Sequence, residues 1–332
     1  MQSHPQLVLN LKRYAMNTRN SVIGFIGLGA MGSRMAKRLI DAGFKVVVFD
    51  RKREKVEALA AQGAAMAPTA RTLAMEADVI MSCLSNDEAV AEVYGDGVIS
   101  SAASGNIIIE MSTISPETSR ELWRAGKARG LEVLDVAISG GPPLAEQGAL
   151  TLLAGGSESA FNDCAPIFAA IARQHFLLGP SGSGTTMKLV VNAVMGVSMQ
   201  AIAEAVSLGE KLGLPRERLL KVLSQTAVIA PAQQSKLLRA AVNDYSAQFP
   251  ISLMNKDFHL VMERAAANAV PMPATAAAYQ INLVRAARKP DEDYSGVIVE
   301  MREWSAAGEG ASLDEGLPTE INPVATANGR FN

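Results

Sequence analysis

The chain has 332 residues, of which 48% are hydrophobic and 19% charged, and its formal net charge is −2. This composition predicts about two globular domains with a substantial core, and the lack of a basic block argues against nucleic acid as a partner. The two cysteines, Cys83 and Cys164, make neither a disulfide framework nor a metal site, so we expect a cytoplasmic protein without metal. No apolar run approaches the roughly 20 residues that span a bilayer, so we expect no membrane contact.

The two ends of the chain differ in composition from the rest. Residues 1–20 hold three basic residues and no acid. That pattern is typical of an organelle transit segment, but the stretch is short and poor in serine. We therefore favour a flexible extension, with Met16 as an alternative start. Residues 308–332 are rich in glycine, proline, asparagine and acids, which predicts a mobile tail.

The first half of the chain alternates between short branched-apolar runs and helical segments. The runs read as buried strands of a parallel sheet and cover residues 21–27, 44–50, 77–84, 106–112, 131–139 and 150–156. The helical segments are 30–42, 53–62, 87–94, 116–129 and 158–171. This alternation predicts a Rossmann-like, doubly wound α/β domain over residues 21–182.

From about residue 183 the strand runs disappear and helical periodicity dominates. A long helix is expected over 184–212, followed by helices over 215–225, 231–242, 253–269, 274–287 and 293–306. The fold class is thus α/β plus an all-helical C-terminal domain, 183–307, joined by a long helix.

A glycine-rich loop follows the first predicted strand. Gly27, Gly29 and Gly32 have the G-x-G-x-x-G spacing, which permits a tight turn, close approach of a pyrophosphate, and close packing of helix on strand. The helix that follows presents free N–H groups to phosphates. The motif alone is weak, but its position between a strand and a helix favours a dinucleotide site. The predicted cofactor-binding loop comprises Gly27, Leu28, Gly29, Ala30, Met31 and Gly32.

Asp50 ends the second predicted strand, 18 residues after Gly32. A carboxylate there would accept hydrogen bonds from a ribose 2′-hydroxyl and repel a 2′-phosphate, which favours NAD. Arg51 and Arg53 could instead bind that phosphate, so NADP stays possible.

Lys188 is the one formal charge between Arg173 and Glu204. A lone cation in an apolar helix costs solvation free energy, unless its stem packs while the amine reaches water. The other interpretation is a lysine whose pKa is lowered for proton transfer, because desolvation and an adjacent positive nicotinamide both disfavour the ammonium. Asn192 lies on the same helix face, four residues on.

Five blocks together resemble the β-hydroxyacid dehydrogenase family, which includes 3-hydroxyisobutyrate dehydrogenase and tartronate semialdehyde reductase. They are GFIGLGAMGSRMAKRL at 24–39, EMSTISP at 110–116, DVAISGGPPLAEQGALT at 135–151, GSGTTMKLVVN at 182–192 and NKDFHL at 255–260. The resemblance implies reversible, nicotinamide-linked oxidation of a small hydroxy acid. It also implies a homodimer or homotetramer in which the helical domains contribute to the substrate site and to dimerisation.

The resemblance also assigns roles to residues of this sequence. Lys188 matches the general acid or base, and Asn192 a residue that orients it and the substrate. The substrate carboxylate would bind at Ser139, Gly140 and Gly141. Near the cofactor the matching residues are Leu84, Ser85, Thr113 and Lys256, the last of which closes over it.

Departures from the family pattern leave the substrate open. Ala137, Leu144 and Ala149 replace residues that are usually proline, glycine and threonine, so the turn after Gly141 is bulkier. Candidates are 3-hydroxyisobutyrate, tartronate semialdehyde, glyoxylate, succinic semialdehyde and longer analogues. An imine reductase-like enzyme and a non-catalytic dinucleotide-binding scaffold are the alternatives, and Lys188 argues against both.

Overall fold

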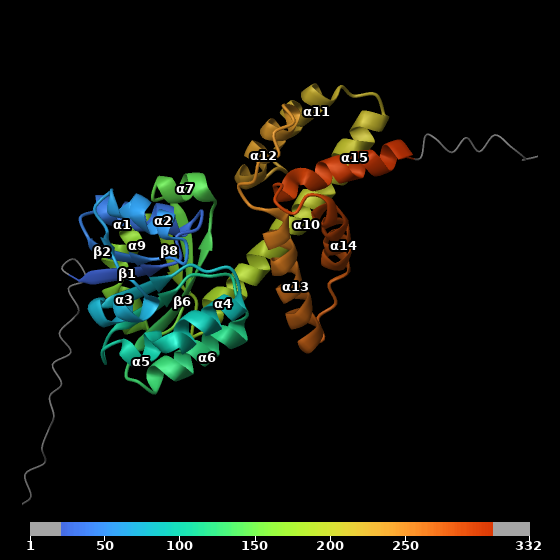
Figure 1. The fold of residues 1–332 in the computed structure, drawn as a ribbon. Coiled ribbons are helices and arrows are strands. Elements are labelled where there is room, and N and C mark those ends of the chain that lie inside the picture. The colour runs from blue at the N-terminus through green and yellow to red at the C-terminus, as the bar shows by residue number, and fades with distance from the viewer. Residues whose placement is uncertain (1–20, 308–332) are drawn as a thin grey trace, which may run out of the picture.

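The computed structural model describes residues 21–307, so the extension predicted at 1–20 and the tail predicted at 308–332 lie outside the described residues. Figure 1 shows an α/β domain, a helical domain, and the long helix α10 (Ser183–Lys211) running from one into the other. The expected fold class is confirmed. The division predicted at residue 182 falls one residue before α10.

The α/β domain is built on an eight-stranded sheet with the order β3-β2-β1-β4-β5-β6-β7-β8. All six predicted strands are present, because their Val- and Ile-rich runs are buried between helical layers. Two further strands, β3 and β8, extend the edges. The strands are β1 (Val22–Ile26), β2 (Lys45–Phe49), β3 (Ala65–Met66), β4 (Val79–Ser82), β5 (Ile107–Glu110), β6 (Glu132–Ser139), β7 (Leu150–Gly155) and β8 (Ala172–Leu177).

The expectation of a wholly parallel sheet is wrong at one place, since β7 pairs antiparallel with β6. Ten residues separate Ser139 from Leu150, and a parallel crossover needs a dozen or more. The chain instead makes a short helix, α7 (Pro142–Glu146), and returns beside β6. The segment after Gly141, for which the sequence predicts a bulky turn, forms this helix.

The helices of the α/β domain agree with the predicted segments, with one break. Pro166 lacks the N–H that would continue a helix, so the segment predicted over 158–171 is two helices. Helix α3 has a threonine capping box but was too short to show periodicity. The helices are α1 (Gly32–Asp41), α2 (Arg53–Ala60), α3 (Ala70–Glu76), α4 (Asp87–Val93), η2 (Tyr94–Val98), α5 (Ile99–Ser101), α6 (Pro116–Lys127), α8 (Glu158–Asp163) and α9 (Ala165–Ile171).

Helix α10 is anchored to the sheet by a buried carboxylate. Asp135 on β6 accepts hydrogen bonds from the backbone N–H of Gly182 at 2.8 Å and of Thr185 at 3.0 Å. These donors lie at the start of the helix, where N–H groups lack intrahelical partners. The first turns of α10 therefore belong to the α/β domain, packed on β6 and β7.

The later turns of α10 form the centre of the helical domain. Its other helices are α11 (Arg216–Leu223), α12 (Pro231–Ala241), α13 (Ile251–Ala267), α14 (Pro273–Arg288), η3 (Tyr294–Gly296) and α15 (Val297–Ala307). A Cβ on Gly196 would lie 2.3 Å from the ring of Phe258, so glycine lets α13 approach α10 closely.

The expectation about apolar runs is also wrong. By length and composition α10 could cross a membrane, and among residues 21–307 it is the one helix that could. Half of its most apolar window is buried inside the protein, as in the core helix of a helical domain.

Candidate active site

The predicted cofactor and substrate residues of the α/β domain lie together at the carboxyl end of the sheet. Strands β1, β4, β5 and β6 run parallel, so their carboxyl ends lie together. In open α/β sheets, ligands bind beyond these ends. The segments that follow the four strands hold the glycine loop, Leu84 with Ser85, Thr113, and Ser139 with Gly140 and Gly141.

The glycines of the loop divide into two that pack and one that stays open. A Cβ on Gly27 would lie 2.4 Å from the carbonyl oxygen of Cys83, and one on Gly32 would lie 2.0 Å from that of Gly27. Gly27 also has φ of +91°. A Cβ on Gly29 would meet nothing within 4 Å. The open position fits a cofactor pyrophosphate that approaches the backbone at Gly29.

Substitution of Gly29 by valine is therefore expected to leave the melting temperature nearly unchanged while weakening NADH binding by roughly tenfold or more, since the new side chain occupies the phosphate's position. Titration of NADH fluorescence measures the affinity. The matched variant Gly32→Ala should instead lower the melting temperature. Unchanged NADH affinity in the Gly29 variant would contradict this assignment.

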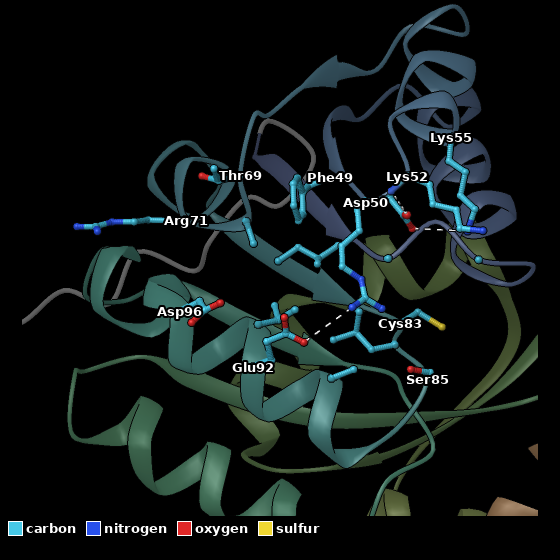
Figure 2. A pocket seen from close by; sticks show the side chains of 18 residues that line it. Phe49, Asp50, Lys52, Lys55, Thr69, Arg71, Cys83, Ser85, Glu92 and Asp96 are labelled. Carbon is cyan, nitrogen blue, oxygen red and sulfur yellow. Dashed lines mark hydrogen bonds and ion pairs between the residues drawn. The ribbon is translucent and has the colours of Figure 1, made fainter.

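A pocket of about 760 Å³ extends from the glycine loop between α2, α3 and α4. Figure 2 shows Asp50 at its wall with Lys52 and Lys55 beside it. Asp50 accepts hydrogen bonds from the backbone N–H of Leu28 at 2.7 Å and of Lys52 at 2.8 Å. Its carboxylate thus braces the glycine loop. Among the predicted cofactor residues, the pocket is lined by Gly27, Gly29, Asp50, Arg51, Leu84 and Ser85.

The remaining loop residues support this pocket without lining it. Leu28 contributes its backbone N–H to Asp50, and its side chain is buried. Ala30 and Met31 lead into α1, and Gly32 begins that helix.

Lys188 lies on the second turn of α10, next to Cys83 of the α/β domain and to α13. Its side chain is half-buried. Desolvation is the main influence and lowers the pKa of Lys188; Asp257 opposes the shift, and the neighbouring Lys256 adds to it. A lysine whose pKa is lowered gives up its proton more readily than an ordinary lysine, which a general acid or base requires.

A polar network connects the face of α10 to the α/β domain. Asn192 is fully buried and donates through Nδ2 to Asp257, whose other oxygen lies 2.9 Å from Lys256 Nζ. Lys256 also donates to the carbonyl oxygen of Thr113. Asn192 Oδ1 has no hydrogen-bond partner. The network therefore fixes the Asn192 amide beside Lys188 and leaves one acceptor free.

Three acids at this site were not predicted from the sequence. Asp257 lies within the fifth quoted block and orients Asn192, Asp135 caps α10, and Glu110 ends β5. Asp135 and Glu110 are each a single charged residue in a buried apolar segment, which is the same pattern that makes Lys188 stand out in the sequence. His259, on α13 one turn from Lys256, is 60% exposed and lies 3.5 Å from Glu263.

The glycine loop and its pocket are those of a dinucleotide-binding domain, and a helical domain follows it. Residues 22–179 match the family model of the NAD-binding domain of 6-phosphogluconate dehydrogenase. Residues 182–301 match the model described as NAD-binding of NADP-dependent 3-hydroxyisobutyrate dehydrogenase. The chain belongs to the β-hydroxyacid dehydrogenase family and is an NAD(P)-dependent hydroxyacid dehydrogenase.

Individual relatives agree over nearly the whole described chain. A 2-(hydroxymethyl)glutarate dehydrogenase of Eubacterium barkeri is 34% identical over 83% of this chain and 93% of its own. An NAD-dependent L-serine dehydrogenase of Pseudomonas aeruginosa is 36% identical over 76% and 87%. The Mycobacterium tuberculosis 3-hydroxyisobutyrate dehydrogenase solved with L-serine has a TM-score of 0.79 and 33% identity, over 85% and 99%.

Proposed function

We propose that the enzyme interconverts a carboxylate bearing a hydroxymethyl group on the adjacent carbon and the corresponding semialdehyde, with Lys188 as the general acid or base. The observation that carries the proposal is Lys188, which is half-buried near Cys83 and Asp257, has a lowered pKa, and lies one helical turn before Asn192. The compounds named for the three relatives, 2-(hydroxymethyl)glutarate, L-serine and 3-hydroxyisobutyrate, share this hydroxymethyl–carboxylate unit.

The residues divide the chemistry among themselves. When bound, the nicotinamide accepts or donates the hydride. In the oxidative direction, neutral Lys188 Nζ takes the proton of the substrate hydroxyl. In the reductive direction, its ammonium donates a hydrogen bond to the carbonyl oxygen and then the proton. The free Asn192 Oδ1 can accept from the Lys188 amine or the substrate hydroxyl, which keeps both in line.

The substrate carboxylate is assigned to the turn after β6. The Ser139 hydroxyl and the backbone N–H groups of Gly140 and Gly141 can donate to an anion, and glycine permits close approach. Gly140 has φ of +132°, a conformation that favours glycine. The bulkier Leu144, 40% exposed on α7, would contact the substituent of the substrate.

A panel of substrates tests this function. Absorbance at the nicotinamide band should report turnover of 3-hydroxyisobutyrate, L-serine, 2-(hydroxymethyl)glutarate and the matching semialdehydes with NAD or NADP. The carboxamide analogue of any active substrate should lose most of its kcat/KM, because it carries no charge for the β6 turn. Turnover of cyclic imines without turnover of any hydroxy acid would contradict the proposal.

NAD is the proposed preferred cofactor, with NADP accepted more weakly. Asp50 lies where it would repel a 2′-phosphate, and the NAD-dependent L-serine dehydrogenase is among the relatives. Arg51 would favour NADP instead, because its guanidinium can bind a 2′-phosphate. Its side chain is 78% exposed and lies 3.9 Å from Glu92, which also lines the pocket, so it is free to turn toward a phosphate.

Removing Arg51 is accordingly expected to weaken NADPH binding about tenfold through loss of a charge-assisted contact, with NADH affinity changed less than about twofold. Calorimetric titration with both cofactors measures this. Lys45→Ala, which removes an exposed cation at the other end of β2, serves as the control. Equal losses for both cofactors would contradict the role given to Arg51.

We also propose a homodimer formed through α10. Its exposed face carries an apolar stripe, with Val190 53%, Val194 63% and Leu208 62% exposed. Such a stripe is typical of a protein interface. Val194→Asp should convert a particle of twice 35.0 kDa to a monomer in sedimentation equilibrium. A wild-type protein that sediments as a monomer would refute the dimer.

A further inference from the structure

Glu110 is a buried carboxyl group that the proposed reaction does not use. It is the last residue of β5, and 1% of its surface is exposed. Its Oε1 accepts a hydrogen bond, but Oε2 has no hydrogen-bond partner. Desolvation by burial raises the pKa of Glu110 to about 7, and Ser112 opposes the shift. A carboxyl group kept in such a place costs free energy, so a role is expected for it.

Hydrogen bonds connect Glu110 to two loops at the carboxyl end of the sheet, where the dinucleotide pocket lies. Glu110 accepts from the Ser112 backbone N–H at 2.9 Å, and the Ser112 hydroxyl accepts from the Leu84 backbone N–H at 2.7 Å. Leu84 lines the dinucleotide pocket. The residue after Ser112 is Thr113, whose carbonyl oxygen accepts from Lys256 of the helical domain. The Glu110 carboxyl group is therefore connected through Ser112 to both the loop after β4 and the loop after β5.

We propose that Glu110 is a positioning residue that sets cofactor affinity through its hydrogen bond with Ser112, by tightening or loosening the loops at Leu84 and Thr113. The inference rests on the proposed function, because it requires a dinucleotide at this end of the sheet. An ionised acceptor makes a stronger hydrogen bond than a neutral one, so deprotonation holds Ser112 more firmly. The loop after β4 is then held more firmly as well, because the Leu84 N–H donates to the Ser112 hydroxyl.

Four titratable groups face Glu110 from the elements packed around it. On the β4 side is Cys83, whose pKa burial raises to about 12. Tyr94 of η2 has its pKa raised further by burial. Asp87 of α4 has a lowered pKa through its hydrogen bonds with Thr118 and Ser115, despite desolvation. Asp135 of β6 has a raised pKa from burial, offset by its backbone donors.

The test is the dissociation constant of NADH, measured by fluorescence from pH 6 to pH 8. In the wild type we expect binding about fivefold tighter at pH 8 than at pH 6, which is the gain from ionising one hydrogen-bond acceptor. Glu110→Gln keeps an acceptor for Ser112 but cannot ionise, so this gain should shrink to less than about twofold.

Two further variants separate positioning from general damage to the core. Ser112→Ala removes the bond to Leu84 and should weaken NADH binding at both pH values. Tyr94→Phe removes a buried hydroxyl that pairs with Ser82, outside the loops, and should keep the wild-type pH profile. A Glu110→Gln protein that keeps the full pH dependence overturns the inference alone, whereas a wild type that binds neither NADH nor NADPH overturns the proposed function.

Discussion

Replacing Lys188 by methionine is expected to lower kcat by about 10³-fold, within the range measured for loss of a general acid or base. Methionine is one atom shorter than lysine, keeps an unbranched apolar stem, and has no proton to exchange. The dissociation constant of NADH should change by less than about threefold, because the glycine loop and its pocket are intact. Single-turnover absorbance at saturating substrate measures the chemical step.

The control for this experiment is Lys188→Arg, which keeps a cation but cannot become neutral. It should be as impaired in oxidation as the methionine variant, and less impaired in reduction, where a permanent cation still polarises the carbonyl. In the wild type, kcat for oxidation should rise with pH as the ammonium of Lys188 loses its proton, at a pH below the ordinary lysine value of 10.5. A methionine variant with full turnover would refute the mechanism.

Replacing Glu110 by glutamine is expected to stabilise the protein at high pH. The pKa of Glu110 is about 7 in the folded protein against an ordinary 4.5, so the folded state holds a proton that the unfolded state has lost. The stability of the wild type therefore falls as pH rises from 4.5 through 7. Above pH 7 the penalty corresponds to roughly 3 kcal/mol, and glutamine does not incur it.

Urea unfolding at pH 5 and pH 8 measures the effect. The free energy of unfolding of Glu110→Gln, relative to wild type, should be more favourable at pH 8 than at pH 5 by about 2 to 3 kcal/mol. Glu110→Asp serves as the control, because it keeps an ionisable group on β5 and should keep a pH-dependent penalty. The same relative stability of Glu110→Gln at both pH values would contradict the raised pKa.

The sequence was sufficient for most of the fold because strand and helix have different periods. Val- and Ile-rich runs located the six strands, and the change to helical period located α10. The antiparallel return of β7 could not be seen, since periodicity does not report strand direction. Strand β3 and helix α3 were missed because they are too short for a period to repeat.

For the site, local patterns located the residues that bind through the backbone or stand out by charge. The glycine loop and Lys188 belong to this group. The carboxylates that act on other residues are harder to find: Asp257 meets Asn192 across 65 positions, and Asp135 meets Gly182 across 47. Such pairs are made by tertiary packing. A lone acidic residue in an apolar strand run is nevertheless visible in the sequence. That pattern predicts a functional or structural role for both Asp135 and Glu110.

Helix α10 also restricts how the two domains can move. Its start is fixed to β6 through Asp135, its later turns form the centre of the helical domain, and no proline interrupts it. Helix α13 adds a second attachment through the ion pair of Arg264 with Glu117, 2.8 Å long. Hinge motions usually occur at loops or element ends, and bending a continuous helix is costly. Rotation of one domain against the other would therefore require bending α10 and breaking the ion pair of Arg264 with Glu117.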